Sequence, residues 1–583
     1  MRISTSKGKT TTLYYIIKDY TKNGKRSTKI IDKIGNIQKI TELSNNEGID
    51  CKTWLNNYLQ EYIKKHSNEK EEILIRKNTE KLITKGERRS YNVGYLFLKD
   101  IYYSLNLNEI CKEIEEKHQF KFDLNNILSN LVFSRIIFPS SKLKTHELSK
   151  KFVEFPNVKL ENIYRGLSYL SSEMDLIQEK IFENSLKVIN RNSKVIYFDC
   201  TNYFFEINNE DNLRKYGINK QHQPSPQVGM GLFLDGDGLP LAFNIYPGNE
   251  SETKHMLPLE NKIVSKFKLK DSKFVVCTDA GLCTDEIKKY NIEDGRGFVI
   301  TQSLKKLKIE YQKEALEATG WRISGDFKNV YNINGIEEDE TLYQKYKNTL
   351  FYKIIQTETA HVKQDLIVTF SFKYKDYNKS IREGQITRAR NKIKDNKNNE
   401  KILIRHHQND YRRFIKETIC IKDESLIEKY NYNIDENLIK EEEQFDGFYG
   451  LTTNLSDDIE TILKVVKGRW EIEESFRIMK HDFLARPVEL SREDRIKAHF
   501  MTCYISLLIY RILEKKLNNK YTTTQILETL KSMNVLELKG DGYVPDYVRT
   551  DLTDDLHEAF DFRTDNEILT YKNYKKIFDQ IKN

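Results

Sequence analysis

Two aspartates, Asp199 and Asp279, end short apolar runs in the segments KVIYFDCT and KFVVCTDAG. If both runs are neighbouring parallel strands, their carboxylates lie at the same end of one sheet, within reach of a shared divalent ion. An aspartate at the end of a strand is also a common turn former or helix cap, so each residue alone has a structural interpretation. The repetition of Lys, apolar run, acid and small residue strengthens the metal-binding interpretation for the pair, and the structural interpretation stays open at this point.

A third carboxylate is offered by Glu473 in the segment KGRWEIEESFRIMK, residues 467–480. On a helix that advances 100° per residue, Arg469, Glu473 and Lys480 lie along one flank of an apolar stripe, with Arg477 just beyond. The stripe consists of Ile472, Phe476 and Met479. Glu473 therefore borders the core beside a cationic row and can lean over the end of a sheet. The alternative is an ion pair between Arg469 and Glu473 on a solvated surface, worth roughly a few tenths of a kcal/mol.

The pattern around the two aspartates predicts a mixed sheet. Two strands joined by the Asp-Gly-Asp-Gly turn at 235–238 follow the strand of Asp199. The helical segment 255–267 then precedes the strand of Asp279, and the segment 297–303 adds a fifth strand. Because a helix crosses over between the third and fourth strands, the first and fourth are expected to be parallel neighbours.

The chain has 583 residues, more than one hydrophobic core usually supports, so we expect several domains. The predicted fold class is a multidomain α+β protein with a mixed sheet flanked by helices, a large β-rich insertion, and an amino-terminal β-ribbon with a helical region. The predicted domains are 1–90 (basic β-ribbon and helical linker), 91–190 (helical), 191–305 (first part of the sheet domain), 306–445 (insertion) and 446–583 (second part of the sheet domain with carboxy-terminal helices).

The first two predicted domains are candidates for binding nucleic acid. TLYYIIKDY and RSTKIIDKIG flank Asn23-Gly24, a pair that suits a tight hairpin. Residues 91–190 follow the helical period, and their short helices and tight turns fit a helix-turn-helix unit. A plain helical bundle that never touches DNA fits equally well.

Positive charge gathers in two places, although the formal net charge is only +8. Residues 1–36 hold nine Lys or Arg against Asp19 and Asp32, an excess of +7. Residues 373–407 hold eleven Lys or Arg against four acids, again +7. Two basic islands on a nearly neutral remainder favour contact with a polyanion, and a solvated surface is the alternative.

Composition favours a protein of a reducing cytosol. The seven cysteines are scattered and odd in number, without a C-x-x-C pair, so neither a zinc ribbon nor a disulfide framework is indicated. The amino terminus has no apolar signal core, and the run MTCYISLLIY is shorter than the ~20 residues of a bilayer span, so it predicts a buried helix. Trp321 is expected in a hydrophobic core, with stacking on an unpaired base as the alternative.

At the acidic residues the sequence resembles bacterial insertion-sequence transposases with an Asp-Asp-Glu triad. In that family the third acid follows the pattern Tyr, two residues, Arg, three residues, Glu, six residues, Lys, and Arg469, Glu473 and Lys480 match these intervals. The Tyr position holds Val466, a departure that affects one phosphate contact attributed to that Tyr. YFDCTNYFFE resembles the first-Asp strand, TDAGL the second-Asp strand, and GNESE a segment commonly found between them. The resemblance extends over most of the chain, including its basic opening.

The resemblance implies a ribonuclease-H-like catalytic domain, with the insertion between the second Asp and the Glu. It implies that Asp199, Asp279 and Glu473 are catalytic and hold two Mg²⁺ ions, which Mn²⁺ can replace. The expected reaction is cleavage of a DNA strand by water, followed by attack of the freed 3′ hydroxyl on a second strand, without a covalent enzyme intermediate.

The same resemblance implies the partners of the protein. Arg469, Lys480 and Arg477 are the expected DNA contacts near the site. The double-stranded DNA would be the inverted-repeat ends of an insertion sequence and a target, bound by a homodimer in the synaptic complex. No membrane partner is expected, and the location would be the cytoplasm, in association with the nucleoid.

Two other functions fit parts of the sequence. One is a domesticated, non-catalytic DNA-binding protein, but the complete triad argues against it because loss of one acid is the simplest route to such a protein. The other is a structure-selective nuclease such as a junction resolvase, which the length, the insertion and the extra amino-terminal region disfavour. Inverted repeats flanking the coding region distinguish a transposase from both.

Overall fold

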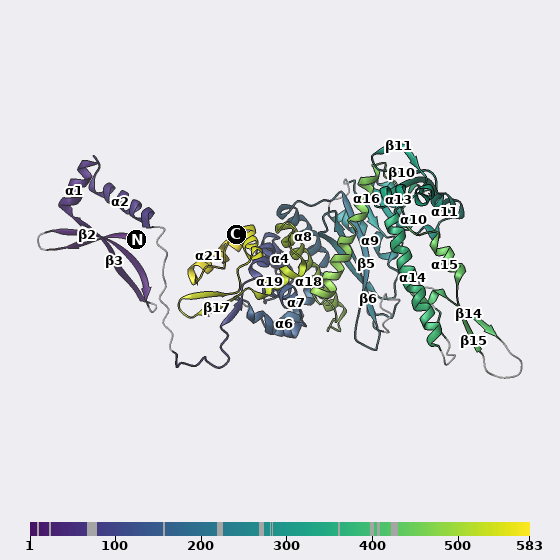
Figure 1. Ribbon diagram of the computed structural model, residues 1–583. Coiled ribbons are helices and arrows are strands. Elements are labelled where there is room, and N and C mark those ends of the chain that lie inside the picture. The colour runs from purple at the N-terminus through teal and green to yellow at the C-terminus, as the bar shows by residue number, and fades with distance from the viewer. Residues whose placement is uncertain are drawn as a thin grey trace. The chain divides into compact units, whose positions relative to one another are not determined.

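A computed structural model describes most of the chain and is drawn in Figure 1. The described residues are 1–8, 11–22, 25–66, 79–154, 158–217, 225–267, 273–279, 281–282, 284–359, 362–396, 402–404, 409–420 and 429–582. The chain divides into two compact units. The first consists of Met1–Tyr91, Asn534–Tyr547 and Arg563–Gln580, and the second of Asn92–Met533, Val548–Phe562 and Ile581–Asn583.

An antiparallel three-stranded ribbon opens the first unit. Its strands are β1 (Arg2–Lys7), β2 (Thr12–Lys22) and β3 (Lys25–Asn36). Lys22 pairs with Lys25, which confirms the predicted hairpin, while its Asn23-Gly24 turn lies outside the described residues. The helices α1 (Ile37–Asn46) and α2 (Cys51–His66) follow. The core of this part consists of Ile16, Ile34, Ile40, Trp54 and Leu55.

The second sheet of the first unit joins segments that are far apart in the sequence. Its order is β19-β18-β17-β4. The strands are β4 (Ser90–Asn92), β17 (Asn534–Leu538), β18 (Gly542–Asp546) and β19 (Leu569–Thr570), and α21 (Tyr571–Lys582) follows. Part of the predicted 446–583 segment therefore belongs to the same compact unit as the amino-terminal segment. The residue limits of the five predicted domains remain predictions.

Helices that pack on one long apolar helix form much of the second unit. That helix is α18 (Glu493–Lys516), and it packs against α3, α5 and α7. Residues 501–510 are buried throughout, which confirms the predicted buried helix. Among the described residues, α18 has the length and composition to cross a membrane, but 94% of its most apolar window is buried inside the protein.

The helical period predicted for residues 91–190 is confirmed. Its helices are α3 (Tyr95–Ser104), α4 (Leu107–His118), α5 (Leu124–Ile137), α6 (Lys142–Leu148), the 3₁₀ turn Ser149–Lys151, α7 (Leu160–Ser172) and α8 (Met174–Val188). Two more helices near the carboxyl end are α19 (Thr523–Ser532) and α20 (Asp551–Phe560). The side chains of Asp123, Ser141, Thr522 and Thr550 accept a hydrogen bond from a backbone N–H in the first turn of α5, α6, α19 and α20.

A ten-stranded mixed sheet is the other main part of the second unit. Its order is β11-β10-β12-β13-β16-β9-β8-β5-β6-β7. The strands are β5 (Val195–Phe204), β6 (Gln227–Asp235), β7 (Pro240–Pro247), β8 (Val275–Thr278), β9 (Gly297–Gln302), β10 (Trp321–Ile323), β11 (Asp326–Tyr331), β12 (Phe351–Thr359), β13 (Val362–Phe370) and β16 (Phe448–Thr453). The strands β5, β8 and β9 pair in parallel, and the other pairings are antiparallel.

The predicted strand order around the two aspartates is confirmed. β5 and β8 are parallel neighbours, β6 and β7 form the predicted hairpin, and β9 is the fifth strand. The hairpin turns at Gly238, whose φ of +79° is a conformation that glycine adopts without steric cost. The crossover before β8 is α9 (Thr253–Lys266), and α10 (Asp285–Glu293) leads to β9.

The predicted insertion, residues 306–445, does not form a sheet of its own from all its strands, because four of them belong to the main sheet. The strands β10 to β13 extend the main sheet, because β13 pairs with β16 over six residues. The remaining elements are the 3₁₀ turns Leu304–Lys306 and Tyr411–Phe414, α11 (Ile309–Leu316), α12 (Ile333–Glu338), α13 (Glu340–Tyr346), α14 (Phe372–Asp395), α15 (Glu436–Glu443), and the paired strands β14 (Ile415–Cys420) and β15 (Lys429–Ile434). Trp321 is fully buried, as predicted, and its indole N–H donates to the Glu317 carbonyl at 2.9 Å.

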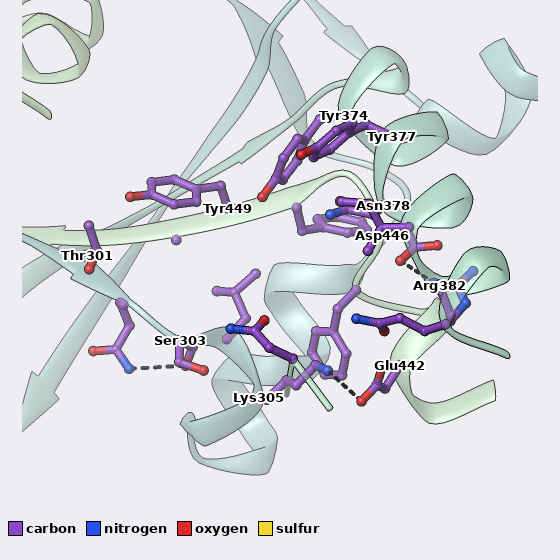
Figure 2. Close-up of a pocket in the computed structure, with 18 of the residues that line it drawn as sticks. Thr301, Ser303, Lys305, Tyr374, Tyr377, Asn378, Arg382, Glu442, Asp446 and Tyr449 are labelled. Carbon is purple, nitrogen blue, oxygen red and sulfur yellow. Dashed lines mark hydrogen bonds and ion pairs between the residues drawn. The ribbon is translucent and has the colours of Figure 1, made fainter. Parts of the chain in front are cut away.

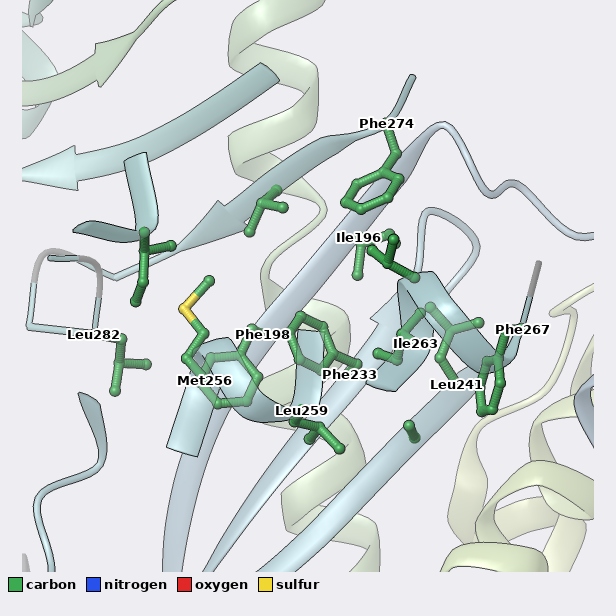
Figure 3. Close-up of a cluster of buried hydrophobic side chains, with 14 of the residues drawn as sticks. Ile196, Phe198, Phe233, Leu241, Met256, Leu259, Ile263, Phe267, Phe274 and Leu282 are labelled. Carbon is green, nitrogen blue, oxygen red and sulfur yellow. The ribbon is translucent and has the colours of Figure 1, made fainter. Parts of the chain in front are cut away.

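Helices cover both faces of the sheet around β5. On one face, Phe198 and Phe233 belong to a buried cluster that includes Met256 of α9, as Figure 3 shows. Burial of each such side chain contributes about 1.5–3 kcal/mol. On the other face, the ring centroid of Tyr203 lies 4.8 Å from that of Phe500 in α18. The β5 strand is thereby held between two helical layers.

The segment that carries Glu473 is not one continuous helix, in contrast to the helical wheel drawn from the sequence. Helix α16 (Ile459–Lys467) ends at Gly468, α17 (Trp470–Arg477) follows, and Ile478–Asp482 form a π-helical turn. The predicted apolar stripe is nevertheless buried, with each side chain at most 6% exposed. Its residues are Ile472, Phe476 and Met479.

Candidate active site

Asp199 and Asp279 lie on adjacent strands, just beyond the residues through which β5 and β8 pair. Asp279 follows the end of β8, as predicted, but Asp199 is the fifth of the ten residues of β5, so it does not end its strand. Tyr197 of β5 pairs with Cys277 of β8 in parallel register, so Asp199 is aligned with Asp279, the residue that follows β8. Aligned residues of neighbouring parallel strands point to the same face, and the strands lie about 4.8 Å apart. The two carboxylates are therefore presented together.

The segment that carries Glu473 crosses this same face of β5. Tyr197, two residues before Asp199, donates its hydroxyl hydrogen to a backbone carbonyl of α16 at 3.0 Å. Lys480 donates to the hydroxyl of Thr201, two residues after Asp199. Because side chains alternate between the faces of a strand, Tyr197, Asp199 and Thr201 share one face. Glu473 belongs to the stretch between these two contacts, so its helix lies over Asp199.

Arg469 connects the second aspartate to the glutamate. Its guanidinium nitrogens lie 3.6 Å from Asp279 Oδ1 and 3.9 Å from Glu473 Oε1. The Arg469 side chain is 15% exposed, whereas those of Asp279 and Glu473 are 56% and 68% exposed. The structure thus places Asp279 and Glu473 on either side of one guanidinium, with Asp199 aligned with Asp279 on the neighbouring strand. Their carboxylate oxygens do not all lie within 4.8 Å of one another in the described structure.

Lys480 lies beside the first aspartate. Besides its bond to Thr201, its ammonium nitrogen is 5.3 Å from the centre of the Tyr203 ring, a cation–π contact. Thr201 and Tyr203 follow Asp199 on the same face of β5. A second cation, in addition to Arg469, is therefore held next to the acids.

The other glutamates of α17 have different partners. Glu471 lies 3.3 Å from Arg511 of α18, and burial raises the pKa of Glu471. Glu474 pairs with Arg477 at 2.6 Å, and this hydrogen bond lowers the pKa of Glu474. Arg477 also pairs with Asp482 at 2.9 Å. Arg477, one of the three predicted DNA contacts, is thus held between two carboxylates outside the acidic cluster.

Helix α18 fixes the position of α17. Arg511 is 4% exposed and donates to the Glu471 carbonyl at 3.2 Å and to the Ser475 hydroxyl at 3.0 Å. It also donates to the Glu514 carboxylate at 2.8 Å. Two of these hydrogen bonds go to α17. A shift of α17 would break them and leave buried N–H groups of Arg511 without acceptors, so the guanidinium resists movement of this helix.

A cavity of about 610 Å³ is lined by Asp279, Arg469 and residues of the predicted insertion, as Figure 2 shows in part. Helix α14 contributes Tyr374 and Tyr377, whose ring centroids lie 6.2 Å apart in a stacked arrangement. Figure 2 labels both rings above Asn378. The cavity therefore extends the acidic site towards α14, which contains most of the described part of the predicted basic island 373–407.

Ion pairs hold the far wall of this cavity. Arg382 pairs with Asp446 at 2.5 Å, and both side chains are 7% exposed. Burial raises the pKa of Asp446, and Arg382 opposes that shift. Lys305 lies 3.7 Å from Glu442. Tyr449 lines the cavity as well, and burial raises the pKa of its hydroxyl to about 12, so the phenol keeps its proton at neutral pH.

Some residues of the site were not found from the sequence. Thr301, Tyr374, Tyr377 and Tyr449 are common residue types that carry no recognisable spacing. The sequence analysis did include three of these residues in larger segments: Thr301 belongs to the predicted fifth strand, and the two tyrosines of α14 belong to the basic island. Neither segment says that these residues face Asp279.

Comparisons with known proteins give one family. Residues 206–509 match the family model described as a transposase DDE domain, a range of just over half the chain. That range includes Asp279 and Glu473, and Asp199 lies seven residues before it. A solved structure that is similar is the cryo-EM structure of a piggyBac transposase synaptic complex with hairpin DNA, at 8% identity and a TM-score of 0.35, with 84% of each chain covered. No curated protein matched the sequence.

Proposed function

The chain belongs to the family of transposase DDE domains, and from this premise we propose that Asp199, Asp279 and Glu473 are the catalytic acids of a DNA transposase. The observation that carries the proposal is the parallel alignment of Asp199 with Asp279, with Arg469 between Asp279 and Glu473. Carboxylates from three separate parts of the chain are presented towards one face of the sheet, and carboxylate oxygens are the ligands that divalent cations such as Mg²⁺ prefer.

The sheet supports a ribonuclease-H-like catalytic domain. Around the acids it has the order β7-β6-β5-β8-β9, and β6 runs antiparallel to its neighbours. The two aspartates lie just beyond the paired residues of the central parallel strands, β5 and β8. Helices cover both faces, as the resemblance implies for that domain.

The donor set fits two divalent cations, Mg²⁺ with Mn²⁺ as a substitute. Three carboxylates at a sheet end offer hard oxygen ligands, which these ions prefer. Such a pair of ions supplies activation of water and stabilisation of the leaving 3′ oxygen. Asp199 on the central strand would be the ligand shared by the ions, and Asp279 and Glu473 would each complete one site. This division does not require all three acids to meet at one ion, and the exposed Glu473 side chain has room to rotate.

Two cations of the helix segment bind DNA phosphates near the cut. Arg469 lies between Asp279 and Glu473, and Lys480 contacts Thr201 on the strand that carries Asp199. Phosphate contacts of this kind fix the register of the DNA without reading its sequence. Arg477 is a weaker candidate because it already bridges two carboxylates.

The DNA is the inverted-repeat ends of a bacterial insertion sequence and, later, a target. The basic ribbon of residues 1–36 and the helices of residues 91–190 bind the ends, since a local excess of positive charge favours phosphate contact. Strand joining needs both ends of the element at once, so the active form is a homodimer on DNA.

Cleavage of element ends tests the function directly. Purified full-length protein is incubated with labelled DNA that carries the inverted repeats flanking its coding region, with Mg²⁺ or Mn²⁺, and each strand is mapped on a denaturing gel. We expect cuts at the element boundary that EDTA abolishes. Binding of the ends without a cut on either strand, in the presence of either metal, would contradict the proposal.

The variant Arg469→Gln is expected to bind Mn²⁺ more tightly than the wild type and to cleave DNA more slowly. Arg469 is a fixed cation between two of the proposed ligands, so it competes with an incoming ion. Each partly exposed ion pair is worth about 0.2–1 kcal/mol, so loss of both pairs contributes about 0.4–2 kcal/mol, an affinity gain of about two- to thirtyfold. Loss of the phosphate contact explains the slower cleavage.

Mn²⁺ affinity is measured by electron paramagnetic resonance of the free ion, and cleavage by the gel assay. Arg477→Gln is the matched control, because it removes a cation of the same helix that pairs with Glu474 and Asp482. We expect wild-type Mn²⁺ affinity from this control. Weaker Mn²⁺ binding by Arg469→Gln would show that the guanidinium does not compete with the ion.

A further inference from the structure

The hydroxyl of Thr301 donates a hydrogen bond to Oδ1 of Asp279. Thr278 of β8 pairs with Ile300 of β9 in parallel register, so Asp279 is aligned with Thr301 on the neighbouring strand. Figure 2 labels Thr301 among the residues that line the cavity, and Asp279 lines the same cavity. The contact therefore comes from the strand that borders the second aspartate on the side away from Asp199.

Packing alone does not explain a hydroxyl at this position. Thr301 is 8% exposed and lies in a central strand between β8 and β16, where a valine of the same shape would fill the space. The Asp279 side chain is 56% exposed, so water alone can solvate its charge. The hydrogen bond therefore fixes one oxygen of Asp279, just beyond the end of β8, to a residue of the neighbouring strand β9.

Arg469 approaches the same oxygen, Oδ1, at 3.6 Å. The Thr301 hydroxyl and the Arg469 guanidinium thus approach the same oxygen of Asp279, the first through a hydrogen bond and the second as a cation at longer range. A hydroxyl that hydrogen-bonds a ligating side chain in this way orients that side chain, and its loss costs about 10- to 100-fold in metal affinity or activity.

We propose that Thr301 is a positioning residue of the site, whose hydroxyl orients Asp279 to bind a divalent cation. This inference rests on the proposed function, because it assumes that Asp279 is a ligand. Thr301 itself does not touch the DNA or the ion. Its effect is on the affinity of the ion and on the metal concentration that cleavage requires.

The test compares Thr301→Val, which keeps the shape and removes the hydroxyl, with Thr301→Ser, which keeps the hydroxyl. We expect Mn²⁺ to bind Thr301→Val about 10- to 100-fold more weakly than the wild type, and Thr301→Ser to bind within about threefold of it. The Mg²⁺ concentration for half-maximal cleavage should rise in the Val variant. End binding and thermal unfolding show whether each variant is folded, and Thr301→Ala gives the same comparison if the Val variant does not fold.

Thr452→Val is the matched control. Thr452 lies on the adjacent strand β16, pairs with Ile300, and is 2% exposed with a hydroxyl that has no hydrogen-bond partner among the described residues. Thr452→Val removes a buried hydroxyl from the strand next to that of Thr301. This hydroxyl does not contact Asp279, so wild-type Mn²⁺ affinity is expected. Equal loss of affinity in this control would assign the effect to strand packing and overturn the proposal.

The outcomes separate this proposal from the proposed function. Wild-type Mn²⁺ affinity in both Thr301→Val and Thr301→Ala, or the same large loss in Thr301→Ser, overturns the positioning role even if the enzyme cleaves DNA. If the wild type binds Mn²⁺, the Val variant binds it weakly, and neither cuts element ends, the positioning role stands and the proposed function fails. The positioning role is also overturned if the wild type does not bind Mn²⁺, or if Asp279→Asn leaves its Mn²⁺ binding unchanged.

Discussion

The variants Asp199→Asn, Asp279→Asn and Glu473→Gln are expected to bind element ends and to leave the DNA uncut. An amide has nearly the shape of a carboxylate but no negative charge, so it is a poor ligand for Mg²⁺. A bound cation stabilises the transition state by several kcal/mol, and its loss lowers the rate by about 10³-fold or more. Single-turnover cleavage on the denaturing gel measures this loss, and a mobility shift measures end binding in the same samples.

Glu474→Gln is the control for the three acid variants. Glu474 is the next residue of α17, and its carboxylate pairs with Arg477 instead of with Arg469. Its loss removes one negative charge from the same helix, and cleavage near the wild-type rate is expected. Wild-type cleavage by any of the three acid variants would remove that acid from the catalytic set. Loss of cleavage in Glu474→Gln as well would indicate that the helix, not one carboxylate, is disturbed.

The strands that carry the aspartates were predictable because their signals are local. Each has an apolar run followed by an acid, and the helical segment between them requires a crossover that makes β5 and β8 parallel. Parallel alignment then decides which side chains share a face, so the approach of Asp199 to Asp279 follows from pattern alone. The apolar stripe of α17 was predictable for the same reason, as its spacing repeats within two turns.

Contacts between distant segments had no such signal. Nothing in the local pattern shows that Thr301 donates to Asp279, or that Tyr197 lies under the junction of α16 and α17. The strands β10 to β13 were predicted as an insertion, and their place in the main sheet depends on the pairing of β13 with β16, which lie about 80 residues apart in the alignment of Thr369 with Tyr449. Pairing partners at such distances are chosen by the whole fold, so one sequence does not reveal them.

Gly468, at the junction of α16 and α17, lies directly against β5. A Cβ atom at this position would lie 2.0 Å from the hydroxyl oxygen of Tyr197, closer than any real contact. Tyr197 is 3% exposed and its hydroxyl is bound to the Val465 carbonyl, so it has no free direction in which to move. Gly468 itself has a φ of −64°, which every residue type adopts, so its backbone does not require glycine. Close approach of β5 to the helix junction is therefore what the glycine permits.

The variant Gly468→Ala is consequently expected to separate α17 from β5. The added methyl group must push the junction away from Tyr197, and Glu473, five residues further on, moves with the helix. A displacement of about 1 Å at a catalytic group costs about 100-fold in rate. Overpacking also lowers the free energy of unfolding by about 1–3 kcal/mol. The cleavage gel and chemical denaturation measure the two effects on the same preparation.

Two comparisons isolate the steric cause. Gly384→Ala, in helix α14, adds a methyl group where no atom lies within 4 Å, so it should raise the free energy of unfolding slightly, as alanine does in a helix. Combining Gly468→Ala with Tyr197→Leu removes both atoms that the new methyl group meets first, the hydroxyl oxygen at 2.0 Å and the ring carbon at 2.6 Å. Because the two residues are in contact, the double variant should lose less stability and less cleavage than the sum of the single losses. Additive losses would mean that the added methyl group does not act through its contact with Tyr197.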